Sequence, residues 1–387
     1  MIFYIIRRFF SAPVIYVLFC ACILILLMQS FVQTTIISEK RISLLLFLLM
    51  FGLIVKNSFK TFPITQIAFT LIGYVSFISI IDLGFCTELY SHIFSLFFWA
   101  IVLAQIGNMK IDNITLFYIA CIMSLCCNIM SYLYIYQIFP EIEFMQDDNL
   151  RIASLNSIYY ILHLIPFIFL FKNKLLKILS LIIPIYAIII SEKSTCIICL
   201  CVIMLYVFYH ILKKYTLHVT MLIPIMLPVI LYNDFISKKS SELYSLIKVD
   251  LDSGGNGRWE LFANTINMFL DSDVVSIIFG HGVDSVSKAL GLGAHNDFFE
   301  MLYCYGLIGL ILMLYFWFVL YKMTQRISNG NLRLSYSISL IVLLFSMSFS
   351  KIFLTQLGMF PIAILIGTIY SHNKYSQSTQ MLLKKML

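Results

Sequence analysis

Charged residues are scarce in this chain of 387 residues, because Asp, Glu, Lys and Arg make up only 12% of it. A soluble domain carries about 25%. Hydrophobic residues account for 61%, and apolar runs of about 20 residues recur through most of the sequence. A soluble globular protein is therefore excluded. The sequence predicts an all-α polytopic membrane protein, because helices satisfy their own backbone hydrogen bonds in lipid. The net charge of +7 is a topology signal, and we expect no nucleic-acid partner.

The sequence also lacks a polar stretch long enough to fold as a soluble domain. We therefore expect one integral membrane domain over residues 1–387, with a long loop at 233–296 inserted between helices. About twelve transmembrane helices are predicted, at about 12–32, 42–55, 62–81, 89–107, 114–139, 156–171, 175–190, 194–212, 216–232, 297–320, 333–352 and 354–370. The segment 42–55 is short for a full crossing, so whether it spans the bilayer stays open.

Three signals of other protein classes are missing. No small-x-small cleavage site follows the apolar run after Arg7 and Arg8, so we expect an uncleaved first span. Nearly all of the ten cysteines lie inside apolar runs, and packing explains them, including Cys196 and Cys199, better than disulfides or metal binding. No external segment carries Asp-x-Asp or paired histidines, so we expect no metal and no other cofactor.

The basic residues indicate the topology. With the N-terminus in the cytoplasm and the spans alternating, most of the 26 Lys and Arg residues fall in cytoplasmic loops, whereas Asp112 is the only one of the 19 acidic residues to do so. This is the distribution of the positive-inside rule. We therefore expect a protein of the bacterial inner membrane, with both termini cytoplasmic and the 233–296 loop in the periplasm.

The end of this loop holds the most unusual polar residues. Segment 258–270 carries aromatic and aliphatic residues at helical spacing, which predicts an amphipathic helix at the membrane surface. Segment 285–290, bounded by Gly282 and Gly291, predicts a second short helix. The loop then runs through His295 and Asn296 into an apolar helix.

His295 is a candidate general base because it lies where this loop meets the apolar helix. Asp297 is expected to cap the helix, with Glu300 completing a capping-box-like pair. An imidazole at this junction titrates near neutral pH and has a rigid mount. The simpler interpretation is that His295 and Asn296 are only loop and cap. Further along, Gly306 and Gly309 share one helix face, which lets another helix approach closely.

Two arginines are candidate anion ligands. Arg258 follows a glycine-rich approach, and its guanidinium can grip phosphate oxygens with two donors. The alternative is an arginine that snorkels at the start of a surface helix. Arg151, close to the entry of the 156–171 span, has the same two interpretations. His163 and His92 are expected to be packed, hydrogen-bonded residues.

Several of these residues resemble one family. His295-Asn296, nine residues and then Gly306-Leu-Ile-Gly309 is similar to the H-N-x9-G-x-x-G signature of the bacterial O-antigen polymerase and ligase family. Gly257-Arg258 followed by the segment Phe279-Gly280-His281-Gly282 resembles the family's G-R and G-x-G elements. Arg151-Ile-Ala-Ser resembles its R-x-S/G element. Ser191-Glu192-Lys193-Ser194 resembles its S-R-S/T element, with lysine in place of arginine and one residue inserted.

The resemblance implies a metal-independent, inverting membrane glycosyltransferase with a GT-C-like fold. It would polymerise polyprenyl-diphosphate-linked oligosaccharide repeat units, for O-antigen or capsule, at the periplasmic face. His295 would be the catalytic base, and Arg258, Arg151 and Lys193 would bind the diphosphate. The supporting residues would be Asn296, Asp297, Glu300, Gly306, Gly309 and His281. The lipid-linked oligosaccharide serves as donor and acceptor, and a chain-length regulator protein is a further candidate partner.

Two alternatives stay open. A ligase of the same family would transfer the finished glycan to lipid A core, and the motifs do not separate the two activities. A flippase or transporter of lipid-linked oligosaccharides belongs to a different class and would place charged residues inside its spans. Nearly all charges here fall at span ends or in loops, which disfavours a transporter.

Overall fold

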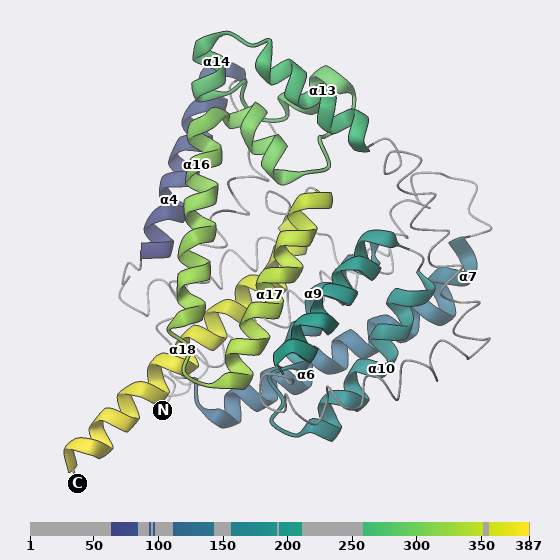
Figure 1. Cartoon of the computed structure of the whole chain (residues 1–387), viewed down its shortest axis with the longest axis vertical. Coiled ribbons are helices and arrows are strands. Elements are labelled where there is room, and N and C mark those ends of the chain that lie inside the picture. Colours follow the sequence, from purple (N-terminus) through teal and green to yellow (C-terminus); the bar gives the residue numbers. More distant parts are fainter. Residues whose placement is uncertain are drawn as a thin grey trace, which may run out of the picture.

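The computed structural model describes residues 63–83, 93, 96, 111–142, 156–191, 193–210, 258–350 and 356–386, and all regular secondary structure within these ranges is helical (Figure 1). The prediction of an all-α protein is confirmed. The helices are α4 (Pro63–Leu83), α6 (Asn113–Leu133), the π-helix η1 (Tyr134–Ile138), α7 (Phe139–Ile142), α9 (Ile158–Ile168), α10 (Lys174–Ile190), Ser194–His210, α13 (Arg258–Leu270), α14 (Val274–Phe279), α15 (Ser285–Leu290), α16 (Asp297–Gln325), α17 (Gly330–Phe349) and α18 (Gln356–Met386).

Within the described part of the chain, three helical stretches are long and apolar enough to cross a membrane: Asn113–Glu141, Asp297–Gln325 and Gly330–Phe349. Other predicted spans correspond to shorter apolar helices, among them Ile158–Ile168 and Ser194–His210. The predicted spans at 12–32, 42–55 and 216–232 lie outside the described residues, and of 89–107 only Ile93 and Leu96 are described, both helical. The count of twelve therefore stays a prediction.

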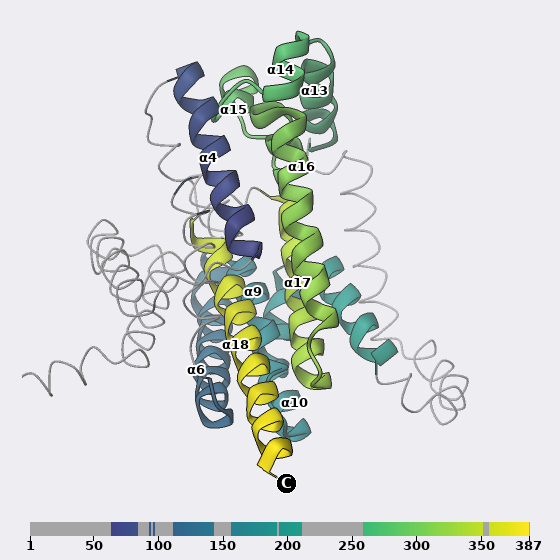
Figure 2. The same cartoon turned by 90° about the vertical axis from the view of Figure 1, so that its left-hand side faces the viewer.

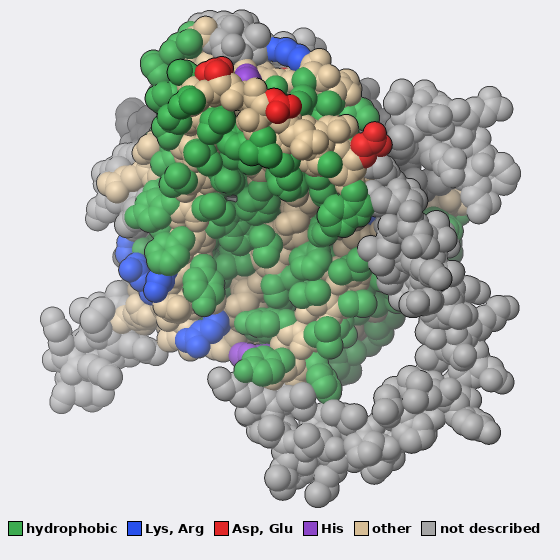
Figure 3. Space-filling model, turned by 45° about the horizontal axis from the view of Figure 1, so that its top comes forward, with side chains coloured by type: hydrophobic (Ala, Val, Ile, Leu, Met, Phe, Trp, Pro, Cys, Tyr) green, Lys and Arg blue, Asp and Glu red, His purple; other side chains and the backbone are tan. Residues whose placement is uncertain are grey.

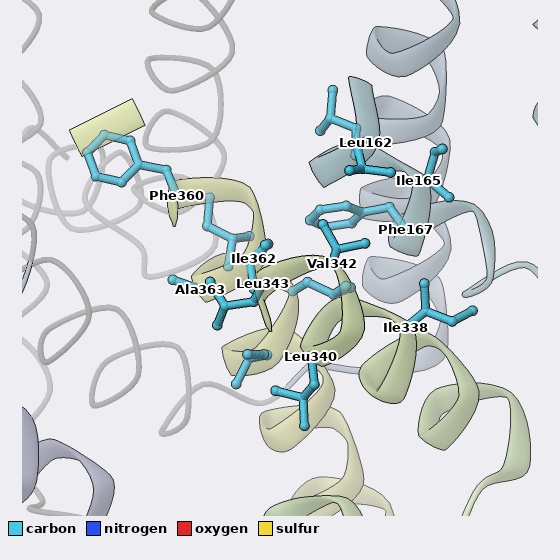
Figure 4. Close-up of a cluster of buried hydrophobic side chains, with 14 of the residues drawn as sticks. Leu162, Ile165, Phe167, Ile338, Leu340, Val342, Leu343, Phe360, Ile362 and Ala363 are labelled. Atoms are coloured by element: carbon cyan, nitrogen blue, oxygen red, sulfur yellow. The ribbon is translucent and has the colours of Figure 1, made fainter. Parts of the chain in front are cut away.

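Helix α9 is the centre of the apolar core. It packs against α6, α10, α17 and α18, and ten of its residues are buried. Figure 4 shows Leu162, Ile165 and Phe167 of α9 facing Ile338 and Val342 of α17. All-round burial explains why this segment is apolar on every face rather than amphipathic.

Two polar side chains of this core make hydrogen bonds across helices, which reduces the cost of burying them. His163 of α9 is fully buried, and its Nε2 lies 2.9 Å from the Ser346 hydroxyl of α17. The Ser335 hydroxyl donates to the Pro166 carbonyl at 2.7 Å. His163 is thus the packed, hydrogen-bonded residue that was predicted, whereas His92 lies outside the described residues. Cys196 and Cys199 are buried free thiols, which confirms their packing role.

One end of the bundle gathers segments predicted to be cytoplasmic. The His372 imidazole Nδ1 lies 2.8 Å from the Ile111 carbonyl oxygen, and the Asn373 amide donates to the Arg326 carbonyl at 3.0 Å. The Lys172 ammonium donates to the Asn113 side chain at 3.2 Å. These contacts join the predicted inner loops near residues 110, 172, 326 and 372, as an alternating bundle requires.

The opposite end carries the helices of the long loop, with α13, α14 and α15 grouped around the start of α16 (Figure 2). On the face shown in Figure 3, the acidic side chains lie at this loop end, and hydrophobic side chains cover most of the wall between the ends. The predicted helix 258–270 corresponds to α13, and the predicted helix 285–290 to α15, which ends at Gly291 with φ 75°.

Candidate functional site

Arg258 is the first residue of α13 and reaches a neighbouring apolar helix. Its Nη1 atom donates to the Thr195 hydroxyl at 3.2 Å. Thr195 is buried in the first turn of Ser194–His210. A neutral hydroxyl orients the guanidinium without neutralising it, so the positive charge stays available to an anion. This contact favours a positioned arginine over a side chain that only snorkels to water.

Lys193 lies two residues before Thr195 and is held from the side of α9. Its Nζ atom donates to the Asn156 amide oxygen at 3.0 Å and lies 6.0 Å from the centroid of the buried Tyr159 ring. Lys193 and Arg258, which are 65 residues apart in the sequence, therefore converge on the start of one helix. We call Lys193 and Arg258 the positive cluster, because one lies in segment 193–195 and the other binds it. Arg151 lies outside the described residues, so its predicted role stays a prediction.

His295 lies at the same end of the bundle, on a turn that is fixed on both sides. Its side chain is exposed and its backbone has a left-handed φ of 49°. Before it, the Ala294 amide donates to the Glu300 carboxylate at 3.0 Å. After it, the Asn296 side-chain amide donates to the Ser348 carbonyl at the end of α17, at 2.8 Å. An accessible imidazole on an immobilised backbone is a suitable mount for proton transfer.

The helix cap differs from the prediction. Asn296 is the N-cap of α16, because its side-chain oxygen accepts from the amides of Phe298 at 2.9 Å and Phe299 at 3.2 Å. Asp297 is instead the first helical residue and is fully buried. Glu300 does not close a capping box, because it accepts from Ala294 rather than from the cap residue. Both carboxylates lie in the first turn of α16, where the helix dipole favours negative charge.

Gly306 breaks α16 and does not belong to a continuous helix face, which corrects the prediction for this residue. Its φ of 64° and ψ of −169° are not helical, so α16 consists of segments 297–305 and 307–325 that meet at a kink. A Cβ atom here would collide with the Ile278 carbonyl at the end of α14. Gly280, with φ 89°, is equally tight against the Cys304 carbonyl. Glycine is required at both positions because only glycine tolerates this backbone and this approach.

The kink leaves helix carbonyls to be paired by other segments. The Tyr303 carbonyl accepts from the His281 amide at 3.1 Å, and the Cys304 carbonyl accepts from the Gly282 amide at 2.8 Å. The Tyr305 carbonyl accepts from the Tyr74 hydroxyl of α4 at 2.9 Å. The FGHG segment and the glycines of α16, which are separate in the sequence signature, thus form one joint. Gly309 lies one turn beyond it, with the Tyr74 ring nearby, so it does permit the close helix approach that was predicted.

His281 is enclosed by this joint. Its ring stacks on Tyr303 with the centroids 4.5 Å apart, and its Nε2 atom lies 2.8 Å from the Ser272 hydroxyl. Ser272 also donates to the Met268 carbonyl at 2.7 Å, which leaves its oxygen to accept a hydrogen bond from His281. His281 is therefore braced by contacts with the loop residue Ser272 and with Tyr303 of α16, whereas the side chain of His295 is exposed.

Helix α13 links the positive cluster to the turn that carries His295. Phe262 of α13 packs on Phe299 of α16, with the ring centroids 5.1 Å apart. Sequence reasoning missed Thr195 and Asn156, which hold the two cations, and Tyr74, which binds a carbonyl at the kink of α16. Thr195 and Asn156 are polar residues at the starts of apolar helices, which is a usable signal, whereas Tyr74 stands out in no sequence pattern.

Comparison with known proteins agrees with the sequence signature. Residues 179–314 match the family model described as O-antigen ligase. The matched range includes Lys193, Arg258, His281, His295 and the kink at Gly306. No curated protein matches the chain. Over these residues the match confirms the predicted resemblance of this chain to the O-antigen polymerase and ligase family.

Proposed function

We propose that this protein is a membrane glycosyltransferase that polymerises polyprenyl-diphosphate-linked oligosaccharide repeat units. One observation carries the proposal beyond the family match. Two cations, Lys193 and Arg258, are held by hydrogen bonds to Asn156 and Thr195 at the end of the bundle where a rigid turn exposes His295. Anion binding and proton transfer are the two tasks that this transfer demands.

In the proposed reaction, the hydroxyl oxygen of the acceptor sugar attacks the anomeric carbon of the donor. The bond between that carbon and the diphosphate oxygen breaks, and polyprenyl diphosphate leaves. Direct displacement inverts the anomeric centre. Arg258, Lys193 and Arg151 stabilise the negative charge that develops on the leaving group. His295 accepts the hydroxyl proton as general base.

The remaining residues support this arrangement. Asn296 and Glu300 hold the backbone around His295, and the buried Asp297 shares the first turn of α16. Gly306, Gly309 and the segment around His281 form the joint that sets the direction of that turn. We place the site in the periplasm, on the 233–296 loop of a single membrane domain with twelve spans, a GT-C-like fold and cytoplasmic termini. The bacterial inner membrane and a chain-length regulator as partner complete the proposal.

A ligase that transfers the finished glycan to lipid A core is the second candidate, because the matched family model is described as O-antigen ligase. The banding pattern of lipopolysaccharide or capsule from a strain lacking this gene separates the two. Loss of the polymerase leaves a single repeat unit on the core, whereas loss of the ligase leaves no glycan on the core. An unchanged ladder in the strain lacking this gene contradicts both activities. A strain in which only the transport of lipid-linked oligosaccharide across the membrane fails also contradicts both.

A further inference from the structure

Helix α14 buries none of its apolar side chains completely. The six residues of this helix, VVSIIF, include no buried residue, and the side chains of Val274 and Val275 are 71% and 65% exposed. Ile278 and Phe279 are exposed as well. A soluble loop rarely leaves a helix in this condition, because contiguous exposed apolar surface marks an interaction site.

The end of α14 is fixed deep beside the membrane helices. The Phe279 carbonyl accepts from the Tyr74 hydroxyl of α4 at 3.1 Å, and the Ile278 carbonyl lies against Gly306 of α16. Helix α4 continues past Tyr74 to its end at Leu83, and Phe77 and Ile81 on this stretch are exposed. Figure 2 shows α4 reaching the level of α14 at the loop end.

Exposed apolar side chains therefore flank α14 on both neighbouring helices. On α16, Leu307 and Ile311 directly beyond the kink are exposed, and α16 is one of the helices long and apolar enough to span the bilayer. Figure 3 shows hydrophobic side chains covering most of the wall below the loop end. The exposed apolar side chains of α14 thus lie next to exposed apolar side chains of a helix that is long and apolar enough to span the bilayer.

The start of α14, at the opposite end from Phe279, is polar. Asp273 caps the helix, and the exposed Asp271 lies just before it. The hydrogen bond from the Ser276 hydroxyl holds the pKa of Asp273 below its ordinary value, so this carboxyl is charged at neutral pH. The charged residues of α14 thus lie at its start, and its apolar end lies beside the kink of α16. This arrangement of charged and apolar residues is typical of a segment that enters the surface of a bilayer.

We infer that α14 is inserted into the lipid leaflet on the loop side of the membrane, with Val274, Val275, Ile278 and Phe279 in contact with acyl chains. The loop that carries His281 is thereby anchored in lipid as well as in α16. This inference does not depend on the enzymatic activity, because it concerns a lipid contact that an inactive protein would also make.

The test uses the full-length protein in liposomes that contain phospholipids with a diazirine in the upper acyl chain. After photolysis, the lipid adducts are mapped by mass spectrometry. We expect adducts within 274–279 at a yield within about threefold of that on 307–314 of α16. The control is 285–290 of α15, where Lys288 and Ala289 are also exposed but no apolar face is present; it should remain nearly unlabelled.

A yield on 274–279 as low as that on 285–290 overturns the inference. The same result follows if a second copy or another protein covers α14, because such a partner would exclude lipid from it. The variant Val275→Asp should lower the lipid adducts within 274–279 at least fivefold, while the adducts on 307–314 persist. Unchanged adducts on 274–279 in this variant would also contradict insertion of its apolar face.

Discussion

At the scale of single residues, the candidate site is notable for how its charges are held. Arg258 donates to a threonine hydroxyl, and Lys193 donates to an asparagine amide. A carboxylate in place of Thr195 would cancel the charge of Arg258 and lower its affinity for a diphosphate. The sequence identified both cations, Lys193 through the family signature alone. It could not identify their partners, because Asn156 and Thr195 become neighbours of these cations only when α9, α13 and Ser194–His210 pack together.

The fork of the guanidinium gives the first prediction. Arg258→Lys keeps the charge but loses the paired donors, so transfer by the purified protein should fall strongly while membrane insertion is normal. Thr195→Val keeps the side-chain volume but removes the acceptor for Arg258, and the KM for the lipid-linked donor should rise about tenfold with a smaller change in kcat. Near-full transfer by Arg258→Ala would show that Arg258 serves only the surface helix.

At the scale of elements, the sequence predicted α13 and α15 correctly from periodicity and bounding glycines, but it missed α14 and misjudged Gly306. Helix α14 is too short for a periodic signal, and its run of valine and isoleucine suggests a strand equally well. Gly306 lies in an apolar run that seems continuous by hydropathy. Only the approach of the α14 carbonyls explains why the helix breaks there.

The second prediction concerns this kink. Gly306→Ala forces a Cβ atom into the Ile278 carbonyl and a positive φ on alanine, so we expect destabilisation of about 1–3 kcal/mol and loss of activity. Gly330→Ala is the matched control, because a Cβ atom at Gly330 meets open space. Thermal unfolding in detergent, followed by fluorescence, would measure both. Equal melting temperatures for the two variants would rule out the joint between α14 and α16.

At the scale of the whole molecule, the charge pattern of the sequence predicts which loops lie together on one side of the membrane. Segments predicted to be on the inside, near residues 111, 172, 326 and 372, meet at one end of the bundle. The number of spans could not be checked in the same way, since four predicted spans lie wholly or mostly outside the described residues. Polymerase and ligase also cannot be told apart at this scale, because both use the same donor chemistry.

The third prediction tests which side each end faces. A cysteine in place of the exposed Lys288 should react with a membrane-impermeant thiol reagent added to intact spheroplasts, whereas one in place of Gln325 should react only after lysis. The unmodified protein, whose described cysteines are mostly buried, sets the background. Reaction of Gln325→Cys from outside would place His295 in the cytoplasm and remove the proposed mechanism.

The most direct test of the central proposal is transfer by purified protein supplied with lipid-linked repeat units, comparing His295→Ala with His281→Ala. We predict a glycan ladder from the wild type. The rate of His295→Ala should be lower by about 100-fold or more, because the general base is lost while the cations still bind the diphosphate. His281→Ala, which loses the contacts of the imidazole with Ser272 and Tyr303, should keep most of the activity. Wild-type activity should also fall as the pH drops through the range in which an imidazole is protonated, because a base must be neutral to accept a proton. A full-rate ladder from His295→Ala, or loss of the ladder from His281→Ala alone, would contradict the account.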